Sequence, residues 1–154
     1  MSLVVFAMGN ALRADDGVGR AVARGLADSV PGLEVMEVQE LLPEHADQLA
    51  NADGALFIDA SVSGSPGEVR AAPLVPRPAR AAVIHALMPE EVMDLARSLH
   101  GRAPPAAMVT VAGRDFAWGE ALSPEAEAAL PLAREKAREL LEGFARRAGP
   151  VRVF

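Results

Sequence analysis

Short apolar segments alternate with helical patterns along this chain, and this alternation constrains the fold more than any other feature. The segment Leu3–Met8 is continuously apolar and ends at Gly9-Asn10, which indicates a strand buried on both faces. A helix is expected next, from about residue 16 to 29, because its apolar residues recur at helical spacing. Strands that alternate with helices predict an α/β domain with a largely parallel central sheet between helical layers.

The rest of the sequence continues the same alternation. Prolines at 73, 76 and 78 predict an extended connection over residues 73–78, because proline cannot donate a hydrogen bond within a central strand. A length of 154 residues suits one domain, so we expect a single domain over residues 1–154. The other expected strands lie at 33–38, 54–58, 67–71 and 107–111, and the other helices at 43–50, 89–99 and from 124 to about 146.

Composition excludes several classes of protein. The net charge is −6, from 21 acidic and 15 basic residues, so nucleic acid is not an expected partner. The absence of cysteine excludes disulfides, thiolate catalysis and iron–sulfur clusters. No apolar run reaches the roughly 18 residues of a membrane span, and the N-terminus lacks the features of a signal peptide. We therefore expect a cytoplasmic protein that does not bind membranes.

The loop after the first strand, residues 9–19, is rich in glycine and acid. Its glycine spacing is not that of a dinucleotide fingerprint, and it lacks the Gly-Lys-Ser/Thr of a P-loop. Two carboxylates at the start of a helix would also repel a phosphate, which argues against the alternative of a nucleotide-binding domain. We expect Asp15 to cap the following helix, which leaves Asp16 available for another role, such as holding a cation.

Three residues form the candidate site: Asp16, Asp59 and His85. Ligands of parallel α/β sheets bind beyond the carboxyl ends of the strands, and each of these residues follows or borders an expected strand end. Simpler roles exist for two of them, since Asp59 is able to form a turn and His85 to pack in the core. Two carboxylates and one imidazole suit a borderline divalent ion such as nickel or zinc, with positions left open for substrate.

The other two histidines are not expected in this site. His100 lies at the end of a helix, where an imidazolium ion interacts favourably with the helix dipole. His45 lies in a short helix of mixed polarity, and we expect it to be exposed.

The order of these motifs resembles the hydrogenase maturation proteases. These endopeptidases remove a C-terminal extension from the large subunit of nickel–iron hydrogenases. The resemblance spans essentially the whole chain, and its first motif is the most specific. The matching segments are Gly9-Asn10-x-Leu12-x-x-Asp15-Asp16-Gly17-x-Gly19, Phe57-Ile58-Asp59-Ala60, Pro66-Gly67, His85-x-Leu87-x-Pro89-Glu90 and Leu122-Ser123-Pro124.

The resemblance implies a three-layer α/β/α sandwich and an endopeptidase of the aspartic type or dependent on nickel. Asp16, Asp59 and His85 match the family's metal-contacting positions and are implied to be the catalytic residues. The implied nickel is supplied by the substrate, a hydrogenase large-subunit precursor, so no permanently bound cofactor is expected. Either a carboxylate or a water polarised by nickel would be the attacking group or base.

Three positions depart from the family pattern. Ala7 stands where many members have glycine, and Ile84 replaces a residue that is commonly polar. Residues 39–44 replace a Gly-Gly-Thr segment, and we expect them to shape the choice of substrate. The alternative function is a non-catalytic metal-sensing or chaperone-like module that binds the same subunit.

Overall fold

The computed structural model describes residues 2–79 and 86–147. Strands and helices alternate through most of the chain, as the apolar pattern predicts. The elements, in order, are β1 (Leu3–Met8), the 3₁₀ helix η1 (Ala14–Gly17), α1 (Val18–Arg24), β2 (Leu33–Val38), α2 (His45–Asn51), β3 (Gly54–Ser61), β4 (Val69–Leu74), α3 (Pro89–His100), β5 (Ala106–Ala112) and α4 (Pro124–Arg147).

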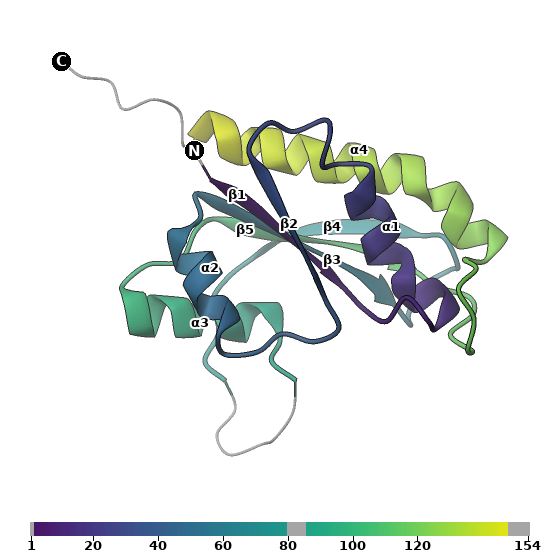
Figure 1. Cartoon of the computed structure of the whole chain (residues 1–154), viewed down its shortest axis with the longest axis horizontal. Coiled ribbons are helices and arrows are strands. Elements are labelled where there is room, and N and C mark those ends of the chain that lie inside the picture. Colours follow the sequence, from purple (N-terminus) through teal and green to yellow (C-terminus); the bar gives the residue numbers. More distant parts are fainter. Residues whose placement is uncertain (1, 80–85, 148–154) are drawn as a thin grey trace.

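The five strands form one sheet in the order β2-β1-β3-β5-β4 (Figure 1). The pairs of β1 with β2, β1 with β3 and β3 with β5 are parallel, and only β4 runs antiparallel to its neighbour. Strand β4 continues through Pro73 to Leu74, further than expected. Because β4 is an edge strand, it tolerates a proline that a central strand would not.

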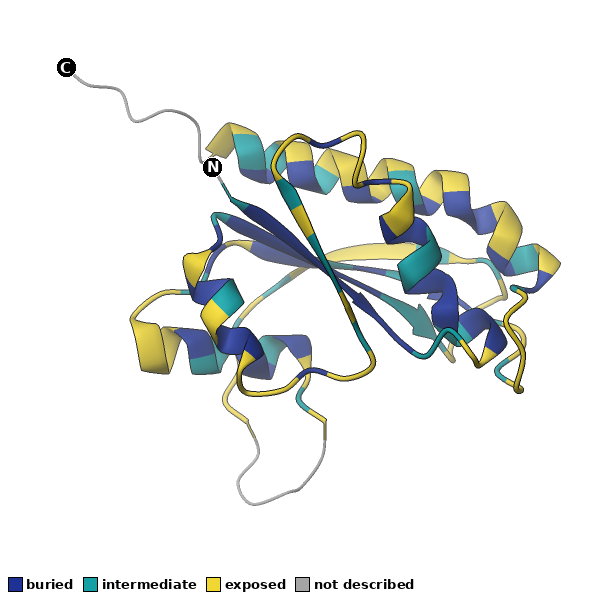
Figure 2. Cartoon of the chain, viewed as in Figure 1, coloured by how far each residue is buried: buried dark blue, intermediate teal, exposed yellow. Residues whose placement is uncertain are grey.

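Helices cover both faces of the sheet, with α1 and α4 on one side and α2 and α3 on the other (Figure 1). Side chains of β1 point alternately to the two faces, as the pleat of a strand requires. Val5 and Ala7 belong to the core under α1 and α4, whereas Val4 and Phe6 belong to the core under α2 and α3. Buried residues accordingly line the sheet and the inner sides of the helices (Figure 2). The expected three-layer α/β/α sandwich is confirmed.

The start of α4 agrees with the sequence, whereas the extent of α1 does not. The hydroxyl oxygen of Ser123 accepts a hydrogen bond from the Ala126 N–H at 3.2 Å, so Ser123 caps α4 as the sequence indicates. The helix expected over 16–29 is instead split into η1 and a short α1, and tight turns follow from Gly25 to Val30.

No helix in the described parts of the chain is long and apolar enough to cross a membrane.

Candidate functional site

The carboxyl ends of β1 and β3 lie side by side, because Ala7 pairs with Ile58 in a parallel register. Helix α1 rests directly on these ends through Gly19. A Cβ atom at Gly19 would lie 2.6 Å from the Ile58 carbonyl oxygen and 2.9 Å from that of Met8. Glycine therefore permits a close approach here, which brings the end of η1 to the carboxyl edge of the sheet.

Asp16 is held by the turn that follows β1. Its Oδ2 atom accepts a hydrogen bond of 2.6 Å from the backbone N–H of Asn10. Gly9 has a φ of 113°, and a side chain at this position would overlap the Asp16 carbonyl oxygen. The half-buried carboxylate of Asp16 thus has a fixed position at the end of β1.

Asp59 lies within β3, which continues to Ser61, rather than ending the strand as expected. Its Oδ1 atom accepts a hydrogen bond of 2.8 Å from the Ala60 N–H. Burial, with a further contribution from the negative charge of Asp16, raises the pKa of Asp59 to about 6, although the Ala60 N–H opposes this shift. The structure therefore brings Asp16 and Asp59 together at one edge of the sheet.

His85 lies outside the described residues, so its position relative to the two carboxylates stays a prediction. Within residues 2–79 and 86–147, no group of three metal-ligating side chains is assembled. The described part of the candidate site therefore consists of two carboxylates, which offer oxygen ligands to a divalent cation.

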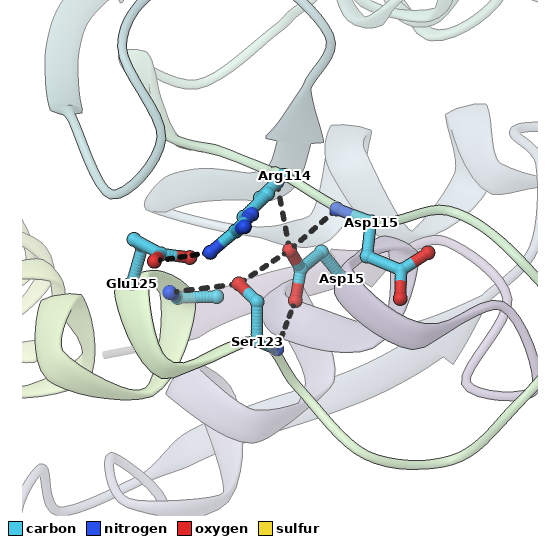
Figure 3. Close-up of polar contacts among 6 residues, drawn as sticks. Asp15, Arg114, Asp115, Ser123 and Glu125 are labelled. Carbon is cyan, nitrogen blue, oxygen red and sulfur yellow. Dashed lines mark hydrogen bonds and ion pairs between the residues drawn. The ribbon is translucent and has the colours of Figure 1, made fainter.

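Asp15 does not cap α1, so that expectation is wrong. The N-cap of α1 is Gly17, which makes no side-chain capping bond. Asp15 is instead fully buried and ties the loop after β1 to the loop before α4 (Figure 3). Its Oδ2 atom accepts hydrogen bonds from the N–H groups of Arg114 and Asp115 at 2.8 and 3.1 Å and from the Ser123 hydroxyl at 2.7 Å. Its Oδ1 atom accepts one from the Ser123 N–H at 2.7 Å.

These four donors determine the charge of Asp15. Burial by itself would raise the pKa of Asp15, but the hydrogen bonds from Ser123, Arg114 and Asp115 favour the ionised form, and the pKa lies below its ordinary value. Asp15 is therefore ionised at neutral pH and joins two loops. The sequence does not predict this role, because the donors lie about a hundred residues away along the chain. The only hint in the sequence is that two adjacent aspartates are more than one helix start needs for capping.

The remaining histidines differ in their surroundings. His45 is only 8% exposed, so the expectation of an exposed side chain is wrong. Its Nδ1 atom accepts a hydrogen bond from the Leu42 N–H at 2.9 Å, and its ring packs edge-on against Phe6. His100 is exposed, and its Nε2 atom lies 2.7 Å from Oδ1 of Asp47, which links α3 to α2. Both histidines thus have structural contacts, His45 with Leu42 and Phe6 and His100 with Asp47.

Comparisons with known proteins bear on this geometry. No protein-family model matches the sequence, and a search of curated proteins finds no significant match. Solved structures do match. The hydrogenase maturating endopeptidase HybD from Escherichia coli is similar with a TM-score of 0.74 and 22% identity, covering 93% of each chain. The chain has the fold of the hydrogenase maturation proteases.

Archaeal structures agree with this result. The [NiFe] hydrogenase maturation protease HybD from Thermococcus kodakarensis has a TM-score of 0.69 and 26% identity, over 91% of this chain and 99% of that chain. A hydrogenase 2 maturation peptidase from a Thaumarchaeota archaeon has a TM-score of 0.68 and 24% identity, over 92% and 98%. The similarity to hydrogenase maturation proteases expected from the sequence motifs is therefore confirmed.

Proposed function

We propose that this chain is an endopeptidase that removes the C-terminal extension of a nickel-loaded hydrogenase large subunit. The observation that carries the proposal is the pairing of Asp16 with Asp59 at the carboxyl edge of the sheet, where α/β proteins bind their ligands. The fold, shared with structures named as hydrogenase maturation endopeptidases, supports the same reaction.

The chemistry of the pair suits recognition of a metal that the precursor carries. Asp16 and Asp59 repel each other when both are ionised, and the raised pKa of Asp59 reflects part of that repulsion. A divalent cation seated in the docked precursor would relieve it by taking oxygen ligands from both, with His85 as the third expected ligand. The enzyme then needs no resident metal, and a precursor without nickel leaves the carboxylates unpaired.

The same carboxylates are also candidates for the general acid and base of the cleavage step. Before a cation is bound, Asp59 has a pKa of about 6, so it is mostly ionised at pH 7 and is able to accept a proton; a cation carried by the precursor would favour its ionised form and so return that proton. Asp16, fixed by the Asn10 N–H, keeps its carboxylate aimed at the same edge. The attacking group is either a carboxylate or a water activated at the site. We propose that this reaction takes place in the cytoplasm.

A processing assay tests the proposal. Metal-stripped enzyme is incubated with precursor prepared with or without nickel, and the C-terminus is measured by mass spectrometry. We expect shortening of the loaded precursor only. Asp16→Asn keeps the size of the side chain but removes its charge, and it should slow processing at least about tenfold, the equivalent of 1.4 kcal/mol. Asp94→Asn, which alters an aspartate of α3 paired with Arg97, is the matched control and should process normally.

Two other outcomes would contradict the proposal. Equal cleavage of both precursors would indicate a carboxylate peptidase that ignores the metal. Binding of loaded precursor without any shortening would favour the non-catalytic metal-sensing or chaperone-like module.

A further inference from the structure

Two large apolar side chains are exposed next to the candidate site. Trp118, the single tryptophan, is 69% exposed, and Leu12 is 51% exposed. Leu12 belongs to the loop that leads into η1, which carries Asp16, and Trp118 belongs to the loop between β5 and α4. Exposed apolar side chains that are held together beside a site commonly mark a binding surface.

Backbone hydrogen bonds hold these two loops against each other. The Gly119 N–H donates to the Leu12 carbonyl at 2.8 Å, and the Ala14 N–H donates to the Gly119 carbonyl at 2.7 Å. The buried Asp15 carboxylate closes the same junction from within (Figure 3). The exposed side chains are therefore carried on a rigid support, which lowers the conformational cost of binding.

Arg13 adds a cation to this surface. Its guanidinium carbon lies 4.1 Å from the centre of the Trp118 ring, in a cation–π stack. Among the residues that the structure describes, no acidic side chain lies within ion-pair distance of Arg13. Asp115, on the facing loop, is engaged by the Ala117 N–H at 2.9 Å. A planar, fixed guanidinium of this kind is suited to receive a carboxylate from a partner.

Arg13 is also fixed relative to Asp16, because the Asp16 N–H donates to the Arg13 carbonyl at 3.0 Å. Arg13 and Trp118 therefore hold a cation and an apolar ring next to Asp16, whose charge acts on Asp59. An acidic group of a partner is repelled by the pair and attracted to Arg13, whereas a cation is attracted to the pair. Charges arranged in this way fix the register of a bound partner.

We propose that Leu12, Arg13 and Trp118, here called the loop platform, dock an extended segment of the hydrogenase precursor that has an apolar side chain next to a carboxylate. This inference rests on the proposed function and adds a determinant of substrate specificity to it. The apolar side chain packs against Leu12 and the free face of Trp118, and the carboxylate pairs with Arg13. The loop platform binds substrate and takes no part in bond cleavage.

Steady-state processing of nickel-loaded precursor tests the loop platform. Trp118→Ala should raise KM about tenfold, as expected for an exposed aromatic anchor, and Leu12→Ser and Arg13→Gln should each raise it about threefold to tenfold. In all three, kcat should stay within about twofold of the wild type, because uniform binding is lost. The controls are Leu132→Ser and Arg138→Gln on α4, which remove an equally exposed leucine and an exposed arginine elsewhere. Unfolding temperature shows that each variant is folded.

Fluorine NMR of chain labelled with 5-fluorotryptophan gives a direct readout, since Trp118 contributes the only signal. Unlabelled precursor should shift or broaden this signal. An unchanged signal together with unchanged KM in the three variants would overturn the loop platform while leaving the proposed function intact. If the wild type does not cleave the precursor, the proposed function fails. The loop platform is then tested by binding alone: a dissociation constant that rises in the three variants supports it, and an unchanged one overturns it.

Discussion

The buried carboxylate of Asp15 is the residue on which the loops around the site depend. Asp15→Asn keeps the shape but places an amide against four hydrogen-bond donors, so we expect the free energy of unfolding to fall by about 3 kcal/mol at pH 7. Because the pKa of Asp15 is lowered on folding, its contribution is present above about pH 4 and is lost as the pH falls through the folded-state value. Urea unfolding of both proteins at pH 7 and in acid measures this.

The exposed residue Asp28 provides the control for that experiment. Asp28→Asn should change stability by less than about 0.5 kcal/mol at either pH. An Asp15→Asn variant as stable as the wild type at pH 7 would show that the buried network does not hold the loops.

The contribution of Asp59 to stability should change with pH in the opposite direction to that of Asp15. Its pKa is raised to about 6, so the folded chain binds more protons than the unfolded chain between about pH 4 and pH 6, and stability falls as the pH rises through this window. Asp59→Asn removes the buried charge and should raise the free energy of unfolding by about 1–3 kcal/mol at pH 8. The gain should disappear below about pH 4. A loss of stability at pH 8 would contradict the raised pKa.

The sequence predicts the carboxylate pair but not its surroundings. Asp16 comes after β1, and Asp59 follows the apolar run of β3 while still lying within that strand, so the rule for parallel sheets is enough to place them near one edge. The partners of Asp15 and the burial of His45 depend on contacts between distant segments, which local pattern does not encode. The role of His85 stays a prediction based on family resemblance.

At the scale of the elements, the packing of α1 on the strand ends makes a sharp prediction about two glycines. Gly19→Ala places a Cβ atom against the carbonyl oxygens of Met8 and Ile58, and because backbone cannot easily give way, we expect a loss of about 1–3 kcal/mol. Gly143→Ala within α4 meets only the end of the Arg146 side chain, at 3.9 Å, and should stabilise the chain by about 0.5–1 kcal/mol. Thermal and urea unfolding of the two variants compares them directly. Equal effects would indicate that α1 does not need its close approach to the sheet.

Element types were easier to predict than element ends. The strands beneath helices were recognisable because burial on both faces leaves continuous apolar runs, as in β1 and β3. Strand β4 is expected to end before Pro73, because a proline inside an edge strand hides the strand from sequence analysis. Helix α1 is shorter than its apolar pattern, since the turns from Gly25 to Val30 bury Leu26 and Val30 without helical continuation.

For the molecule as a whole, the central sheet is shared by two separate cores. Alternate residues of β1 enter one core or the other, so neither helical layer has a complete core without the sheet. An arrangement in which both layers depend on the same strands should unfold in one step. If residues 1–154 form a single domain, as the sequence predicts, the chain should therefore unfold cooperatively.

Scanning calorimetry of two core variants tests this prediction. Leu141→Ala opens the core under α4, and Leu49→Ala opens the core under α2; both side chains are fully buried in the native chain. Each should cost about 2–5 kcal/mol and lower the one transition by roughly 10 °C, with equal calorimetric and van't Hoff enthalpies. If each variant instead shifted a different transition, the two helical layers would be independent folding units. In that case, damage to the layer of α2 and α3 would leave the other layer, which contains α1, folded, whereas a cooperative chain loses both layers at the same temperature.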